Sequence, residues 1–160
     1  MKLFLLILAA VAAALWLWRR YYYGDAGTVF MADDAQLAVA KAEARASLPQ
    51  FWAALERGDP ADSEFALKFN LNHGTDAADR ESIWAVDVAR RGGRIFGTLG
   101  NDPVNPAWRI GDEVEIAPEA IDDWSYFRGD IAQGHFVTRL MLQTASPGVA
   151  KAQKQALGWG

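Results

Sequence analysis

Residues 82–99 read SIWAVDVARRGGRIFGTL, in which the pair Gly92-Gly93 separates two apolar runs. Two glycines in this position are typical of a two-residue hairpin turn, because such turns need positive φ angles. The turn predicts a register in which Arg91 faces Arg94. The same register pairs Val88 with Gly97 and Val86 with Leu99, and it gathers these side chains on one face: Trp84, Val86, Val88, Ile95 and Leu99.

Three further segments show the alternation of a half-buried strand. Residues 64–71, EFALKFNL, place apolar side chains at every second position, and residues 113–116, EVEI, do the same with Val114 and Ile116. Residues 135–143, HFVTRLMLQ, form an apolar run that we interpret as the last, central strand. With the hairpin, these segments predict a sheet of about five antiparallel strands.

The segment before the strands predicts helices. Residues 35–57 are rich in alanine and other strong helix formers, but they contain Pro49. Proline removes a backbone donor and disfavours helix at the preceding residue. We therefore expect two helices, over about 35–46 and 49–57, with Ser47 as the cap of the second.

The order of these elements, helices first and strands after, predicts an α+β domain in which helices pack on a strongly twisted antiparallel sheet. An SH3-like open barrel with an added helix is the alternative. The tail, residues 146–160, carries no core signature, and we expect it to be loosely held apart from a short helix.

The N-terminal segment, residues 1–23, contains sixteen consecutive apolar residues from position 3 to 18. As a helix they would span roughly 24 Å, and Trp16, Trp18 and three tyrosines at 21–23 would extend the span at the membrane interface. We expect an uncleaved, single-pass membrane anchor. The alternatives are a signal peptide cleaved at an Ala12-x-Ala14 site and a helix buried on the domain. Lys2 and the Arg19-Arg20 pair compete for the cytoplasmic side, so both a periplasmic or extracytoplasmic and a cytoplasmic domain fit.

The expected organisation is thus an anchor or signal segment over 1–23, a linker over 24–34, one domain over 35–145 and the tail over 146–160. A chain of 160 residues that is 51% hydrophobic suits a single core. Residues 24–160 carry 13 basic against 20 acidic residues, a net charge of −7, which disfavours nucleic acid as a partner. The absence of cysteine excludes disulfides and thiolate chemistry, and no residue pattern predicts a cofactor.

Six motifs in this order and spacing resemble the YegJ-like bacterial proteins, the domain of unknown function 2314. They are ARASLPQFW (44–52), ESIWAVDV (81–88), GTLGNDP (97–103), GDEVEI (111–116), IDDWSYF (121–127) and GHFVTR (134–139). The resemblance covers about 35–143. It implies the α+β fold and no activity, ligand or cofactor, since the family has none agreed. The positions that it marks are Ala44, Pro49, Phe51, Glu81, Trp84, Gly97, Asn101, Pro103, Gly111, Ile121, Asp123, Trp124, Tyr126, Gly134 and Arg139.

Asp122 and Asp123, with nearby Asp130, are the first candidates for chemistry, either as acid and base or as oxygen ligands of a divalent cation. Adjacent residues tend to point to different sides, however. We therefore interpret 120–127 as a turn in which Asp123 accepts backbone N–H bonds and Asp122 is solvated. His73 and His135 lack the third partner that a zinc site needs, so we predict no metal.

Two hypotheses follow. The first is a membrane-tethered module that binds a protein or peptide in a groove between the Trp84 hairpin and the Asp123-Trp124 turn. Its binding residues would be Trp84, Asn101, Trp108, Trp124 and Arg139. The second is an envelope hydrolase that uses Asp123 or Glu81 with His135.

Overall fold

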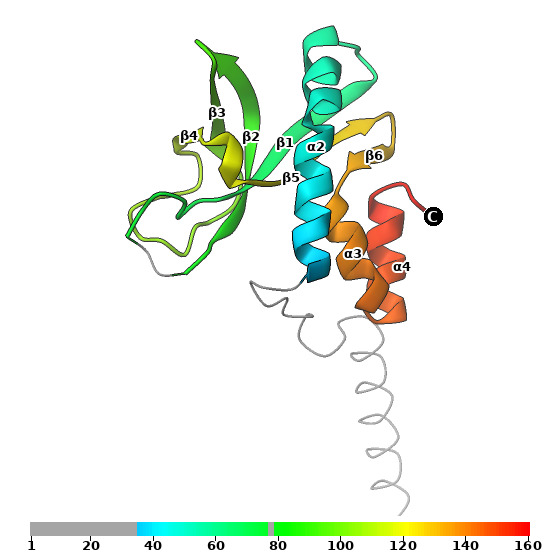
Figure 1. Ribbon diagram of the computed structural model, residues 1–160. Coiled ribbons are helices and arrows are strands. Elements are labelled where there is room, and N and C mark those ends of the chain that lie inside the picture. The colour runs from blue at the N-terminus through cyan, green and yellow to red at the C-terminus, as the bar shows by residue number, and fades with distance from the viewer. Residues whose placement is uncertain (1–34, 77–78) are drawn as a thin grey trace, which may run out of the picture.

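The computed structural model describes residues 35–76 and 79–160, which form one antiparallel sheet with helices gathered at one end (Figure 1). Six strands lie in the order β4-β3-β2-β1-β5-β6, one more than predicted. The combination of helices with one antiparallel sheet confirms the α+β prediction, and the sheet is not closed, because β4 and β6 are its two edge strands. The strands are β1 (Asp62–Asn70), β2 (Ser82–Arg91), β3 (Arg94–Leu99), β4 (Glu113–Ile116), β5 (Ile121–Arg128) and β6 (Ile131–Gly134).

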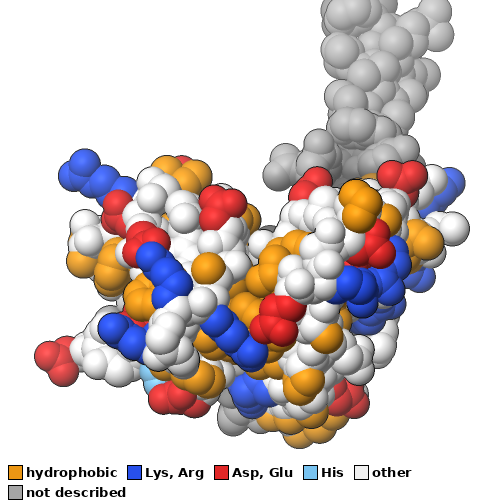
Figure 2. Space-filling model, turned by 90° about the horizontal axis from the view of Figure 1, so that it is seen from above, with side chains coloured by type: hydrophobic (Ala, Val, Ile, Leu, Met, Phe, Trp, Pro, Cys, Tyr) orange, Lys and Arg blue, Asp and Glu red, His pale blue; other side chains and the backbone are white. Residues whose placement is uncertain are grey.

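Three α-helices and one short 3₁₀-helix accompany the sheet: α2 (Ala35–Arg57), η1 (Pro118–Ala120), α3 (Phe136–Thr144) and α4 (Pro147–Ala156). Helix α2 runs across β5 and lies beside α3, with α4 next to α3 (Figure 1). Viewed from above, charged side chains of both signs are interspersed, and hydrophobic atoms line the hollow between the strands on the left and the helices on the right (Figure 2). The core lies between α2 and one face of the sheet, where Phe51, Leu67 and Trp124 are buried.

None of the helices in the described part of the chain is long and apolar enough to span a lipid bilayer. The predicted anchor, residues 3–18, and the predicted linker lie outside the described residues.

The first helix continues through Pro49, so the prediction of two helices was wrong. Proline costs one backbone hydrogen bond, but the turns that follow it bury Phe51 and Trp52 in the core. Ser47 does not cap a second helix. Its hydroxyl donates to the carbonyls of Glu43 and Ala44, as serine does inside a helix.

The hairpin is confirmed at its turn, where Arg91 pairs with Arg94, but its register changes further out. A bulge between Val86 and Ala89 pairs Val86 with Thr98 instead of Leu99. The predicted shared face is therefore wrong. The core face carries Ile83, Ala85 and Val88 with Ile95 and Leu99, whereas Trp84 and Val86 lie on the other face of the sheet.

Residues 121–127 form the buried strand β5, where we had predicted a turn. Trp124 and Tyr126 face α2, and Trp124 Nε1 donates to the carbonyl of Ala44 at 3.0 Å. Asp122 and Asp123 are 2% and 0% exposed, so the prediction of a solvated Asp122 was wrong as well. A local pattern cannot show that β1 and β6 lie on both sides of this segment and supply its pairing.

Residues 136–144 form helix α3, where we had predicted a strand. We predicted a strand because the run is apolar enough for a central strand of the sheet, but Phe136, Val137 and Leu140 also recur at helical spacing. The tail is not loosely held either. It forms α4, Leu157 is 6% exposed, and Trp159 Nε1 donates to the carbonyl of Ala132 in β6.

Candidate functional site

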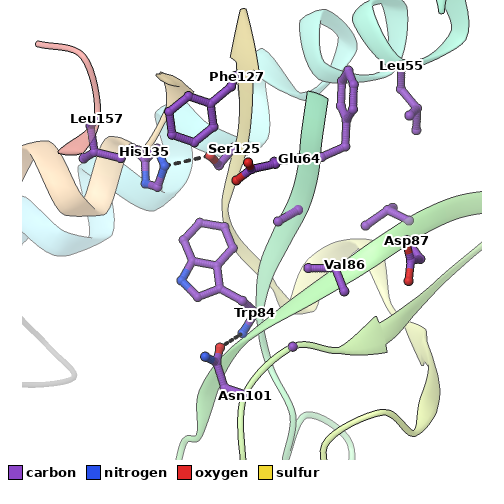
Figure 3. A pocket seen from close by; sticks show the side chains of 14 residues that line it. Leu55, Glu64, Trp84, Val86, Asp87, Asn101, Ser125, Phe127, His135 and Leu157 are labelled. Atoms are coloured by element: carbon purple, nitrogen blue, oxygen red, sulfur yellow. Dashed lines mark hydrogen bonds between the residues drawn. The ribbon is translucent and has the colours of Figure 1, made fainter. Parts of the chain in front are cut away.

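The sheet forks between β1 and β2, and the fork holds a groove. The two strands pair only from Leu67 to Asn70 with Ser82 to Ala85. Beyond this point β1 follows β5 and β2 follows β3, so the remaining halves of β1 and β2 separate. The space between them is a cavity of about 690 Å³, here called the fork groove (Figure 3). Its size falls within the range of ligand sites.

Backbone strain gathers around the fork groove. Among the described residues, three that are not glycine have a positive φ: Glu64 at 54°, Asp87 at 50° and His135 at 57°. All three line the groove. Glu64 lies at the bulge of β1 and Asp87 at the bulge of β2, so the two bulges separate the strands. Non-glycine residues in this conformation cost free energy and concentrate at functional sites.

Apolar side chains form most of the groove wall, with a few polar groups among them. Trp84 and Phe127 stand on the exposed face of the sheet, and Leu55 closes the end nearest α2 (Figure 3). The carboxylates of Glu64 and Asp87 are exposed at the rim, and no lysine or arginine among the described residues lines the groove. The described residues that line it are Leu55, Glu64, Phe65, Ala66, Trp84, Val86, Asp87, Val88, Gly100, Asn101, Ser125, Phe127, His135 and Leu157.

His135 is the polar centre of the groove. It precedes α3, and its Nε2 lies 2.7 Å from Ser125 Oγ while its Nδ1 lies 3.3 Å from Thr138 Oγ1. The ring packs between Trp84 and Trp159, with centroid distances of 5.5 and 5.8 Å. Burial lowers the pKa of His135 to about 4, and the charges of Arg139 and Lys68 add to this effect. The imidazole is therefore neutral at physiological pH.

Protonation of His135 should destabilise the fold below neutral pH. Its pKa is about 4 in the folded chain and near 6.5 when unfolded, so the unfolded chain takes up the proton first as the pH falls. The contribution is fully present above pH 6.5 and is lost as the pH falls toward 4. We expect a loss on the order of 2 kcal/mol from this group, measured by urea unfolding at pH 7 and pH 4.5.

The matched variant for this measurement is His135→Asn, because asparagine tolerates a positive φ and does not titrate. Subtracting its pH dependence from that of the native chain removes the contribution of all carboxylates. If both proteins lose the same stability on acidification, His135 is not the group responsible.

The structure brings some predicted site residues to the groove and leaves others outside. Trp84, Asn101 and His135 line it. Asn101 lies at the lower end, where its Oδ1 is 3.4 Å from the backbone nitrogen of Trp84 (Figure 3). Glu81 lies outside, because its carboxylate accepts the backbone N–H groups of Val104 and Asn105 at 2.5 and 3.0 Å and so shapes the loop between β3 and β4.

Trp108, Trp124 and Arg139 are not part of the groove. Trp108 is half-buried against the core, and Trp124 is 3% exposed on the opposite face of the sheet. The guanidinium carbon of Arg139 lies 3.8 Å from the centre of the Trp159 ring, and the Nε atom of Arg139 donates to the carbonyl of Gly134. The aromatic side chains therefore do not converge as the sequence-based hypothesis required.

The two aspartates of β5 have structural partners. Asp123 accepts hydrogen bonds from the backbone nitrogens of Trp124, Phe136 and Val137, at 2.9, 3.0 and 2.9 Å. Asp123 therefore caps the first turn of α3. The sequence-based interpretation had assigned the residues of α3 to a strand. Burial raises the pKa of Asp123, and these backbone hydrogen bonds oppose the rise.

Asp122 instead forms ion pairs with basic side chains. Its carboxylate lies 3.0 Å from Lys41 Nζ and 3.0 Å from an Arg80 guanidinium nitrogen, and it accepts the hydroxyl of Ser82 at 2.7 Å. Within residues 35–76 and 79–160, no cluster of three or more histidine, cysteine or acidic side chains could hold a metal ion.

Sequence reasoning missed Glu64, Asp87, Ser125 and Phe127. A signal existed for the last two: once 121–128 is read as a strand, the alternation of Trp124 and Tyr126 puts Ser125 and Phe127 together on the opposite face. No local signal marks Glu64 or Asp87, because a bulge depends on the partner strand.

The fold and the groove define an α+β domain whose forked sheet presents an apolar, acid-rimmed groove. The chain belongs to the family of the domain of unknown function 2314, described as uncharacterized proteins conserved in bacteria, and the match covers residues 34–160. The family predicted from the motifs is confirmed, although its description does not use the name YegJ-like. The tail, which we had placed outside the family pattern, lies within the match. No curated protein and no solved structure matches the chain.

Proposed function

We propose that this protein is a binding module whose fork groove holds an extended protein or peptide segment with apolar side chains flanked by basic ones. The observation that carries the proposal is that the three non-glycine residues with positive φ in the described chain surround one groove. Strain of this kind persists only where the surrounding structure imposes it.

The backbone of the fork favours a peptide as the ligand. The first half of β1 has a strand partner on the β5 side only, and the second half of β2 has one on the β3 side only. The strand edges that face each other across the fork are therefore not paired with each other. An extended peptide gains affinity by hydrogen bonding to such edges, and it gains specificity from pockets for its alternate side chains.

The charges at the rim favour basic residues in that peptide. Glu64 and Asp87 are exposed, and no ion pair within 4.0 Å engages either carboxylate in the described structure. Trp84 supplies the large, half-exposed aromatic surface that commonly dominates binding energy.

Binding is tested with the full chain in a mild non-ionic detergent and a short fluorescein-labelled peptide that contains two leucines flanked by lysines. We expect saturable binding by fluorescence anisotropy, weakened at least about tenfold by Trp84→Ala. A second peptide, with glutamate in place of each lysine, should bind measurably less well.

The double variant Glu64→Gln/Asp87→Asn separates the role of the rim from that of the walls. It should weaken binding of the basic peptide, whereas Glu56→Gln/Glu119→Gln, which removes two carboxylates outside the groove, should leave it unchanged. Equal affinity of the native chain for both peptides, or no effect of Trp84→Ala in a folded protein, would contradict the proposal.

The hydrolase alternative has less support in the geometry. The carboxylate oxygens of Asp123 and Glu81 accept hydrogen bonds from backbone N–H groups, and neither carboxylate hydrogen-bonds to His135. The imidazole hydrogen-bonds to the hydroxyls of Ser125 and Thr138, and a histidine with a pKa of about 4 is a weak base.

The tether predicted from the sequence is part of the proposal. The apolar residues 3–18 would hold the module at a membrane, on either side, and fractionation of cells that express the full chain tests this.

A further inference from the structure

Lys68 lies beside the fork groove and lines a second, smaller cavity. It projects from β1 on the same face as Trp84, with its Nζ 5.7 Å from the centre of that ring. The second cavity has a volume of about 190 Å³ and lies between α2, α3 and the sheet. Its lining is Leu37, Lys41, Lys68, Ser82, Asp122, Val137 and Met141.

The charged groups of this cavity are paired, with the exception of Lys68. Asp122 forms ion pairs with Lys41 and Arg80 and also accepts a hydrogen bond from the Ser82 hydroxyl. No oxygen of the described residues accepts a hydrogen bond from Lys68, although Asp123 is opposite it in the β1–β5 register. An ammonium in a half-buried site without an acceptor is costly, which favours the neutral amine.

Some of the groups around Lys68 lower the pKa of its amine and others raise it. Burial lowers the pKa of the amine, and the positive charge of Lys41 on α2 adds to this. Asp123 and Asp122 on β5 oppose the shift. The carboxylate of Asp123 is already bound to three backbone N–H groups, and Asp122 to two cations and a hydroxyl. His135 is neutral and contributes no charge.

We propose that Lys68 is a nucleophilic amine that forms an imine with a small aldehyde or ketone bound in this cavity. Lysines in apolar surroundings next to another cation are activated in this way. The nitrogen lone pair forms the new bond to the carbonyl carbon, and the carbonyl oxygen leaves as water with the two protons of the amine, so no oxidant or reductant is needed. The volume admits a compound of roughly six non-hydrogen atoms. Val137 and Met141 supply an apolar part of the lining beside the amine.

The test traps the imine in the full chain, in a mild non-ionic detergent, with acetaldehyde and cyanoborohydride at pH 7. The hydride reduces the imine to a secondary amine, which peptide mass spectrometry locates. The chain has five lysines, and Lys151 and Lys154 on the exposed face of α4 serve as internal controls. We expect Lys68 to react at least about tenfold faster than these two, because more of it is neutral.

Two variants sharpen the test. Lys41→Gln removes a cation and frees part of Asp122, and both changes raise the pKa of Lys68, so labelling of Lys68 should slow severalfold and its pH profile should move upward. Lys151→Gln should change neither. Thermal unfolding confirms that each variant is folded. Labelling of Lys68 in the native chain that is no faster than at Lys151 and Lys154, or that appears only after unfolding, overturns the proposal.

Discussion

Gly134→Ala is expected to destabilise the fold by at least about 3 kcal/mol and to leave little soluble protein. Gly134 ends β6 with a φ of 76°, a conformation that disfavours any side chain. A Cβ atom at this position would collide with the carbonyl oxygen of Trp124 and would lie 2.5 and 2.8 Å from two carbons of its indole. Urea unfolding, or the yield of folded protein, measures the effect.

The indole cannot move aside cheaply. Trp124 is 3% exposed, its Nε1 donates to the Ala44 carbonyl and the Ser47 hydroxyl, and its ring packs against Phe51 and Phe136. A shift of the ring would therefore break contacts with α2 and α3 together. This absence of free volume is what makes the expected effect large.

Gly74→Ala is the matched control. Gly74 has nearly the same φ, 73°, but an added Cβ would meet no atom within 4 Å. It therefore measures the conformational cost alone, which we expect to be about 1 kcal/mol. If Gly134→Ala lowers the free energy of unfolding no more than Gly74→Ala does, Gly134 is not packed as closely against Trp124 as the structure indicates.

Asp123→Ala is expected to cost at least about 3 kcal/mol. The carboxylate is fully buried, and it accepts the backbone N–H groups of Trp124, Phe136 and Val137. Two of these belong to the first turn of α3, which has no other side-chain cap from its own N-terminal residue. The alanine variant would leave buried donors without partners and an empty volume beside them.

Asp130→Asn serves as the comparison, because Asp130 is exposed in the turn between β5 and β6, where asparagine is equally suitable. We expect a change within about 0.5 kcal/mol for this variant. Urea unfolding, monitored by tryptophan fluorescence and by far-ultraviolet circular dichroism, measures both. A loss below about 1 kcal/mol for Asp123→Ala would show that α3 does not depend on this cap.

Local sequence patterns predicted the elements whose partners are close in the chain. The Gly92-Gly93 turn pairs Arg91 with Arg94 as expected, since a tight turn leaves the flanking residues one register. Val114 and Ile116 face the core because strict alternation allows one apolar face. The family also followed from motifs spread along the chain.

The errors lie where a distant partner decides the outcome. Residues 121–127 look like a turn because two aspartates precede Trp124, but pairing with β1 and β6 makes them a strand. Residues 136–144 are compatible with strand or helix, and Asp123 decides for the helix by capping it from another element. The fork groove has the same origin. Glu64 and Asp87 carry no local signal, and each acquires its positive φ from a bulge against a neighbouring strand.

The sequence by itself thus determined the α+β class, the hairpin turn, the inward face of β4 and the family, because these depend on contacts between near neighbours or on residue type. Only the tertiary structure decided the identity of β5 and α3, the continuity of α2 through Pro49, and the meeting of Trp84 and His135 beside two strained carboxylates. The physical reason is that backbone pairing, burial and bulges across the sheet join residues far apart in the chain, and their free energy exceeds the local preferences of those segments.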